Sequence, residues 1–309
     1  MLITRRDLGR LTLGAASAGT LLHAAAKPNS NFGGVQIGAI TYSFRTLPGS
    51  AEEILRYCVD CGISAVELMA GAAESYAGAP SAPAKGPGAE ALKAWRTSVS
   101  MDKYKAFRKM YADAGVKIYA FKLPPTMAMS DAEYEYIWNV GETLGANHIT
   151  MELPADDAHL ARVAEYAAKR KLRIAFHTHG QGGSSGFEKA LNASKFTALN
   201  LDVGHYFALT GDSPIPIMEK YHGRIASLHL KDRKGPASAP PGARGGRAGG
   251  PNMPWGEGET PLVQILQTMK KNKYKFPASI EYEYNTPAGS DVLAEMKKCV
   301  AFCRKALAS

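Results

Sequence analysis

Long hydrophobic runs are scarce in this sequence of 309 residues. The apolar stretch at residues 11–22 is too short to span a bilayer comfortably, and no other stretch is long and apolar enough. It follows the arginine pair Arg5-Arg6 and precedes small alanines at residues 24–26, as in a twin-arginine signal peptide. We therefore predict a signal peptide over residues 1–26, export to the periplasm or another extracytoplasmic space, and no stable membrane insertion after its removal.

Nucleotide-binding and nucleic-acid-binding signals are also missing. No Gly-x-Gly-x-x-Gly follows the first predicted strand, and no phosphate-cradling glycine loop opens a helix. The net charge of +9 is spread over the predicted helices rather than massed on one face, so we expect no nucleic-acid partner.

Cysteine is sparse. The four cysteines, Cys58, Cys61, Cys299 and Cys303, have helical spacing within two predicted helices. Buried thiols are the expected state, and a disulfide formed after export or a structural metal site is the alternative.

What the sequence does contain is a regular alternation of short apolar strands with amphipathic helices. Eight strand–helix pairs favour a closed (β/α)8 TIM barrel as a single domain over residues 27–309, with an open doubly wound sheet as the alternative. The predicted strands are Val35–Thr41, Ile63–Leu68, Val116–Leu123, His148–Leu153, Leu172–His177, Leu199–Val203, Ile225–Leu230 and Ala278–Tyr284.

Two predicted loops, residues 70–100 and 234–254, are unusually long and follow strand ends. In a barrel both would lie on the face that carries the active site. The second is rich in Gly, Ala, Pro and Arg, which indicates either a disordered insertion or a mobile basic lid over an anionic substrate.

Ionisable residues recur where predicted strands end. Glu152, Asp202, His229 and Glu281 end the fourth, sixth, seventh and eighth strands, which would surround one mouth of a barrel. Three carboxylates and one imidazole suit one divalent metal ion, Mn²⁺ above all, with Co²⁺, Mg²⁺ or Zn²⁺ as alternatives. Glu283 competes with Glu281 for the last position, because side chains two apart share a face of a strand.

These residues, with Asp202-x-x-His205, His229-x-x-x-Arg233 and the Gly-Glu-Gly of residues 256–258, resemble the sugar isomerase/epimerase superfamily with a xylose isomerase-like TIM barrel. The likeness spans roughly residues 35–305. It implies metal binding by Glu152, Asp202, His229 and Glu281, and it favours Glu281 over Glu283.

The resemblance also implies a proton-transfer mechanism. Glu152 and Glu281 would act as catalytic acid and base on opposite sides of a sugar, next to a metal-polarised carbonyl, through an enediolate. His205 and Arg233 would bind substrate oxygens. Three further strand residues are predicted substrate contacts: His177, Glu67 and Lys122.

The sequence therefore predicts a metal-dependent isomerase or epimerase for a small, unphosphorylated sugar or keto-sugar. A lyase or hydrolase acting on 3-keto-glycosides is the alternative enzyme, and a catalytically silent sugar-binding barrel is the alternative without chemistry. The sequence leaves open whether the chain forms a homodimer.

Overall fold

The computed structural model describes residues 27–81, 89–179, 184–240, 242 and 249–308. The predicted signal peptide, residues 1–26, lies outside the described residues, as does part of the predicted loop 234–254.

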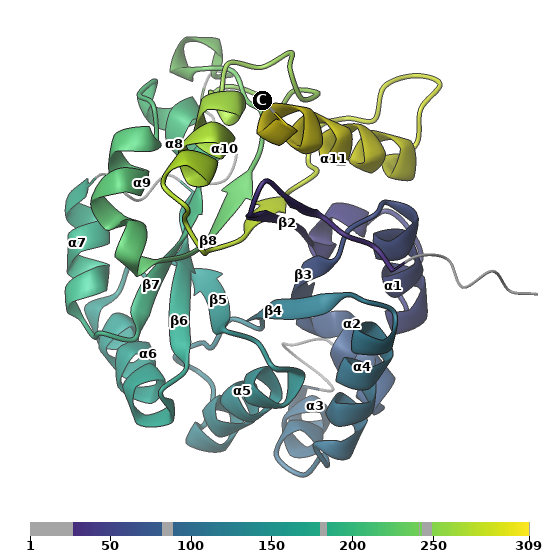
Figure 1. Cartoon of the computed structure of the whole chain (residues 1–309). Helices are drawn as coiled ribbons and strands as arrows, with labels where there is room; N and C mark the ends of the chain where they lie inside the picture. Colours follow the sequence, from purple (N-terminus) through teal and green to yellow (C-terminus); the bar gives the residue numbers. More distant parts are fainter. Residues whose placement is uncertain (1–26, 82–88, 180–183, 241, 243–248, 309) are drawn as a thin grey trace, which may run out of the picture.

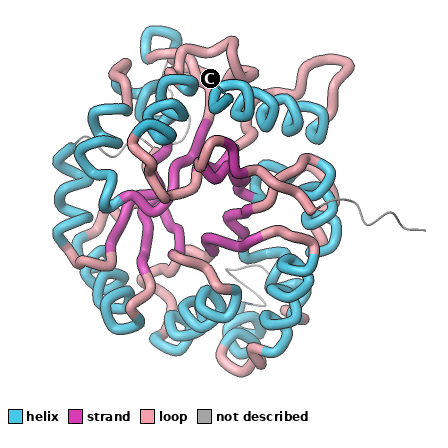
Figure 2. The backbone as a smooth tube through the Cα atoms, viewed as in Figure 1, coloured by secondary structure: helices cyan, strands magenta, loops and turns pink. Residues whose placement is uncertain are grey.

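Eight parallel strands form a closed barrel at the centre of the molecule. Strands β2 to β9 lie side by side in sequence order, and β2 pairs with β9 to close the sheet. Figure 1 and Figure 2 show these strands enclosed by a ring of helices. The predicted (β/α)8 barrel is confirmed. The strands are β1 (Asn31–Phe32, antiparallel to β2), β2 (Val35–Ile40), β3 (Ala65–Met69), β4 (Lys117–Lys122), β5 (His148–Glu152), β6 (Arg173–His177), β7 (Thr197–Asp202), β8 (Ile225–Leu230) and β9 (Ala278–Ile280).

The helices begin at capping residues that the sequence makes recognisable. Ser50 and Glu53 form a capping box at the start of α1, and Ser130 and Glu133 form one at the start of α5. The described helices are α1 (Ala51–Asp60), α2 (Ala70–Ala77), α3 (Ala89–Arg96), α4 (Asp102–Asp113), α5 (Asp131–Leu144), α6 (Asp157–Arg170), α7 (Ser184–Asn192), α8 (Val203–Thr210), α9 (Ile215–Tyr221), α10 (Leu262–Lys271) and α11 (Val292–Ala308).

The core between strands and helices is apolar, whereas the barrel interior holds a buried polar layer. Tyr119 hydrogen-bonds Ser279, and His148 bonds Ser227 at 3.0 Å. Side chains on a strand alternate between the two faces, so the same strands supply an apolar outside and a polar inside. The four cysteines are all buried and free, as the buried-thiol prediction requires.

The last barrel strand is shorter than the sequence predicts. It ends at Ile280, so the prediction that Glu281 and Glu283 lie within a strand is wrong. At this point the side chain of Ser43 hydrogen-bonds the backbone. Its hydroxyl donates to the Ile280 carbonyl at 3.2 Å and accepts from the Tyr282 amide at 3.0 Å. A side chain thus replaces the neighbouring strand, and the backbone leaves the sheet.

The predicted loop 70–100 contains two helices, α2 and α3. Arg96 of α3 donates to both carboxylate oxygens of Glu74 in α2, at 2.8 and 3.1 Å, in a buried pair. The Tyr136 hydroxyl of α5 also donates to Glu74, at 3.0 Å. These contacts depend on residues distant in sequence, which explains why local composition pointed to a loop.

Helix α8 begins directly at the end of β7, where the sequence analysis placed only a strand end. Asp202 is its amino-terminal cap, because its Oδ1 accepts the His205 amide at 2.7 Å. Gly204 lies in the first turn against β8, and a Cβ there would be 2.6 Å from the Lys231 carbonyl oxygen. Only glycine permits this close approach.

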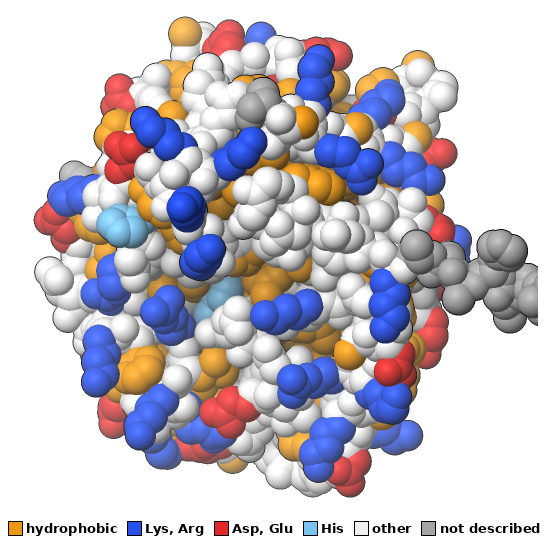
Figure 3. Space-filling view, viewed as in Figure 1, with side chains coloured by type: hydrophobic (Ala, Val, Ile, Leu, Met, Phe, Trp, Pro, Cys, Tyr) orange, Lys and Arg blue, Asp and Glu red, His pale blue; other side chains and the backbone are white. Residues whose placement is uncertain are grey.

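The surface carries both charges. Figure 3 shows Lys and Arg side chains spread over the face in view, with Asp and Glu among them toward its edge. No helix among the described residues is long and apolar enough to cross a membrane.

Replacing Gly204 by Ala should destabilise the protein by about 1–3 kcal/mol, because the added methyl group forces the backbone of α8 away from β8. The matched control is Gly71→Ala, an exposed helical position whose Cβ meets nothing within 4 Å, where the change should stay within about 0.5 kcal/mol. Chemical denaturation of both variants checks this. Equal effects would contradict the close-approach explanation.

Candidate active site at the barrel mouth

Ionisable side chains from neighbouring strands meet at the carboxyl end of the barrel. The strand register pairs Glu152 of β5 with His177 of β6, and Asp202 of β7 with His229 of β8. Glu281 follows directly after β9. This is the end at which (β/α)8 barrels carry their active sites.

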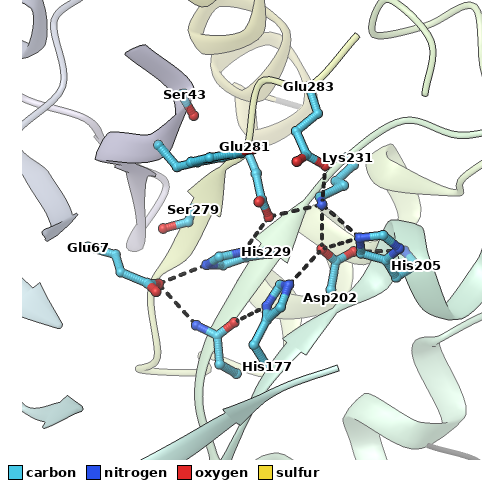
Figure 4. Close-up of polar contacts among 12 residues, drawn as sticks. Ser43, Glu67, His177, Asp202, His205, His229, Lys231, Ser279, Glu281 and Glu283 are labelled. Atoms are coloured by element: carbon cyan, nitrogen blue, oxygen red, sulfur yellow. Dashed lines mark hydrogen bonds and ion pairs between the residues drawn. The ribbon is translucent and has the colours of Figure 1, made fainter. Parts of the chain in front are cut away.

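Four of these side chains form one compact buried group, which we call the mouth cluster: His177, Asp202, His229 and Glu281. One ligand atom from each lies within 4.8 Å of the others, and all four residues are buried. Figure 4 shows these side chains converging. Three of the four predicted metal ligands are thus brought together. The fourth, Glu152, lies outside the group, and His177 lies within it.

Glu152 lies beside the mouth cluster and is more accessible. Its side chain is 40% exposed, with Oε1 3.2 Å from Lys122 Nζ and Oε2 2.8 Å from His179 Nδ1. Burial alone would raise the pKa of Glu152, but the hydrogen bond of His179 and the charges of His177 and Lys122 lower it to about 2. Glu152 is therefore an ionised carboxylate at neutral pH, and Lys122 is its partner.

His229 lies between two carboxylates. Its Nε2 is 2.8 Å from Glu67 Oε2, and its Nδ1 is 2.5 Å from Glu281 Oε2. Burial alone would lower the pKa of His229, but the two carboxylates raise it to about 10. Glu67, predicted as a substrate contact, is fully buried and contacts His229, Thr150 and Asn200.

Lys231 is a site residue that the sequence analysis missed. Its Nζ lies 3.3 Å from Asp202 Oδ2, 3.2 Å from Glu281 Oε2 and 2.6 Å from Glu283 Oε2. Burial alone would lower its pKa, but these carboxylates raise it, so Lys231 is a fixed positive charge. The sequence signal that could have found Lys231 is its spacing from His229, because side chains two residues apart point to the same face of a strand.

The surroundings of Lys231 also distinguish Glu281 from Glu283, the two candidates for one predicted ligand position. Glu281 belongs to the mouth cluster, whereas Glu283 lies at its rim, with a side chain 22% exposed. Burial alone would raise the pKa of Glu281, but Lys231 and His229 hold it well below its usual range.

His205 and Arg233, the predicted substrate-binding pair, are both buried against the cluster. Arg233 donates twice to the Gly250 carbonyl, at 3.0 and 2.6 Å, and its Nη1 is 2.5 Å from His205 Nδ1. Lys231 Nζ is 2.9 Å from His205 Nε2. Burial and these two cations lower the pKa of His205 well below its usual value, so the ring is neutral.

The predicted Gly-Glu-Gly segment holds the loop after β8 in place. Asp232 Oδ2 accepts the amides of Gly256 and Gly258, at 2.8 and 3.0 Å, and Oδ1 accepts the amide of Thr260 at 3.2 Å. A Cβ at Gly258 would overlap the Asp232 carboxylate. The motif therefore fixes the backbone next to Lys231 and Arg233.

The mouth cluster has the chemistry of a divalent-cation site. Asp202 Oδ1 is committed to capping α8, while Oδ2 accepts no hydrogen bond from the described residues and lies 3.9 Å from His177 Nε2 and 3.3 Å from Lys231 Nζ. Carboxylate oxygens and imidazole nitrogens together suit Mn²⁺, Co²⁺ or Zn²⁺. Asp202, His229 and Glu281 would hold such an ion, with either His177 or the predicted Glu152 as a fourth ligand.

Comparison with known proteins supports the fold independently. Residues 158–305 match the family described as Xylose isomerase-like TIM barrel. Over 135 residues the chain is 30% and 29% identical to the inosose dehydratases of two Clostridium botulinum strains, Eklund 17B and Alaska E43. Each match covers 40% of this chain and 45% of that protein, so the chain spans about half the length of these curated relatives.

Solved structures share the barrel at low sequence identity. The probable 3-DHS dehydratase AsbF from Bacillus anthracis has a TM-score of 0.61 at 17% identity, over 85% of this chain and 98% of that one. A sugar phosphate isomerase/epimerase from Parabacteroides distasonis has a TM-score of 0.61 at 18% identity, covering 90% and 96%. An L-ribulose 3-epimerase has a TM-score of 0.58 at 16% identity, covering 89% and 95%.

The purified protein should bind one Mn²⁺ or Co²⁺ per chain, measured by calorimetry and elemental analysis. Asp202→Asn keeps an oxygen that can cap α8 but removes the negative charge. Loss of a residue that only orients a metal ligand costs about 10–100-fold in metal affinity, so the loss of affinity in Asp202→Asn should be larger. Glu165→Gln, on the exposed face of α6, is the control and should bind normally.

The same titration identifies the fourth ligand. Of Glu152→Gln and His177→Gln, the variant with the larger loss of affinity has lost a ligand. A parent protein that binds no divalent ion, or an Asp202→Asn variant that binds it unchanged, would contradict the cation site.

Proposed function

For a chain with the xylose isomerase-like TIM barrel fold, we propose that the mouth cluster and Glu152 form the active site of an enzyme that moves a proton next to a carbonyl group. The substrate would be a small, unphosphorylated sugar or keto-sugar. The observation that carries the proposal is an accessible, ionised carboxylate, Glu152, next to a buried group suited to a divalent ion. A bound ion would stabilise the negative charge that develops on the carbonyl oxygen.

Glu152 would be the base that removes the proton. Lys122 and His179 hold its two oxygens from either side, so the carboxylate is oriented before substrate arrives. Its ionised state leaves it ready to accept a proton at neutral pH.

Glu281 is ionised at rest, so it would take up a proton from solvent water and return it to the other side of the substrate. His229 and Lys231 both contact its Oε2, and no hydrogen bond to its Oε1 is present in the described part of the chain. Oε1 is therefore the atom suited to proton transfer. Return of the proton to the opposite face inverts the carbon, whereas return to the neighbouring carbon gives an isomer.

A lyase is the second candidate, favoured by the dehydratase names of the curated relatives. Removal of the same proton can be followed by loss of a hydroxyl or an aglycone from the adjacent carbon. Such a step needs a group that stabilises the leaving oxygen, and the positive charge of Lys231, buried beside Glu283, is a group of that kind. The proton that Glu152 has taken up would pass to the leaving oxygen as the carbon–oxygen bond breaks.

Incubation of unphosphorylated ketoses and 3-keto-glucosides in D2O tests the proposal. The parent protein should exchange the hydrogen next to the carbonyl for deuterium, followed by proton NMR. Glu152→Gln should lower this rate about 10²–10⁴-fold, the usual contribution of a positioned base. The metal content of the same sample shows whether the loss reflects proton transfer or metal binding, and Glu165→Gln is the control.

The products separate the candidate functions. A deuterated epimer or isomer identifies the isomerase/epimerase. An unsaturated product, formed by loss of water or release of the aglycone, identifies the lyase. Saturable sugar binding without deuterium exchange would overturn both and leave a sugar-binding barrel without catalysis.

We also propose export by the twin-arginine route to a periplasmic or extracytoplasmic space, on the basis of the arginine pair Arg5-Arg6. Replacing both arginines by lysine should retain the full-length chain in the cytoplasm of a host with this pathway, checked by fractionation and immunoblotting. Unchanged export of the variant would contradict this route.

A further inference from the structure

Beneath the mouth cluster lies a buried hydrogen-bond network centred on Glu67 of β3. Thr150 Oγ1 donates to Glu67 Oε1 at 2.7 Å, and both Asn200 Nδ2 and His229 Nε2 contact Oε2, at 3.0 and 2.8 Å. A carboxylate oxygen in this position accepts hydrogen bonds. The His229 nitrogen that faces Glu67 therefore carries a proton, and Nδ1 faces the mouth cluster.

The orientation of Asn200 follows from the same carboxylate. Its Nδ2 donates to Glu67 Oε2 and to Ser227 Oγ, at 3.0 and 2.8 Å. The opposite amide orientation would place two acceptor oxygens against each other in a buried site, which is costly. The Asn200 oxygen must therefore face His177 Nδ1, which lies 2.9 Å away.

This orientation decides the protonation of His177. Because Nδ1 faces an acceptor oxygen, it carries the proton, and a neutral ring can carry only one. Nε2 is then a bare lone pair, directed toward Asp202 Oδ2 at 3.9 Å. At that distance Nε2 has no hydrogen-bond acceptor among the described residues, as expected for a ring that carries its proton on Nδ1 alone.

We propose that Glu67 is a positioning residue that, through the amide of Asn200, sets which ring nitrogen of His177 carries the proton. Glu67 fixes the Asn200 amide, and the Asn200 oxygen then holds the His177 proton on Nδ1, away from the cluster. The importance of this arrangement rests on the proposed function, which needs imidazole lone pairs on the cluster side. The arrangement itself exists without metal or substrate.

Nitrogen NMR of the metal-free protein tests the proposal. With ¹⁵N-labelled histidine, two-bond and three-bond proton couplings report which ring nitrogen is protonated, and the signals missing from His177→Gln identify His177. His229 faces a carboxylate with each ring nitrogen, so it does not report on a choice between them, and His177 is the reporter. The parent should show His177 protonated at Nδ1, the less common form of free histidine.

Three variants separate positioning from simple packing. Glu67→Met removes the acceptor at similar volume and should convert His177 wholly or partly to the Nε2-protonated form. Glu67→Gln can still present an oxygen to Asn200 and His229, so it should retain the parent signature. Thr150→Val is the matched control, because it removes a hydrogen bond to Glu67 without touching either histidine.

Co²⁺ titration provides the second measurement. Glu67→Met should bind Co²⁺ about 10–100-fold more weakly than the parent, as expected for loss of a partner that orients a ligand. Glu67→Gln should lose far less, and Thr150→Val should bind as the parent does.

The outcomes distinguish this inference from the proposed function. A parent that binds no Co²⁺ but shows His177 protonated at Nδ1 supports the inference and contradicts the metal-dependent function. A parent with His177 protonated at Nε2 overturns the inference whatever the metal does, and this holds even if Glu67→Met fails to fold. An Nδ1 signature that survives in folded Glu67→Met overturns it as well.

Discussion

The imidazole of His229, held between Glu67 and Glu281, is the interaction on which the barrel mouth depends. It joins β3, β8 and the segment after β9 by two hydrogen bonds of 2.8 and 2.5 Å. Buried charges are tolerated only when they are paired and hydrogen-bonded. Loss of any one member would leave the others uncompensated, so this contact constrains where the strand ends can lie. Lys231 extends the same pairing to Asp202 and Glu283.

The site has two layers with different tasks. The lower layer, Glu67, Thr150, Asn200 and Ser227, is fully hydrogen-bonded and closed to solvent. A satisfied buried network is rigid, and rigid support is what precise placement of reactive groups requires. The upper layer contains Asp202 Oδ2, which accepts no hydrogen bond from the described residues and is paired with Lys231, and an accessible carboxylate, Glu152. The proposed chemistry therefore takes place in the upper layer.

The fold alone does not select among the outcomes of the proposed proton removal. Its relatives in sequence are named dehydratases, and its structural neighbours include epimerases as well as a dehydratase. Function depends on the site rather than on the fold. In the proposed lyase reaction the deciding groups would be the buried Lys231 and Glu283 at the rim, because a positive charge there would stabilise the leaving oxygen.

The sequence by itself determined the barrel and the strand ends that matter, because hydrophobic periodicity is local and ionisable residues at strand ends stand out against it. It therefore placed Glu152, Asp202, His229 and Glu281 at one mouth. Only the tertiary structure decided that His177 joins three of them, that Lys231 lies among their carboxylates and that Arg233 is buried against Gly250. Local sequence also missed α2 and α3, whose Glu74–Arg96 pair is a tertiary contact. These features depend on strand register and on side-chain distances of a few ångströms across the barrel, which no local pattern encodes.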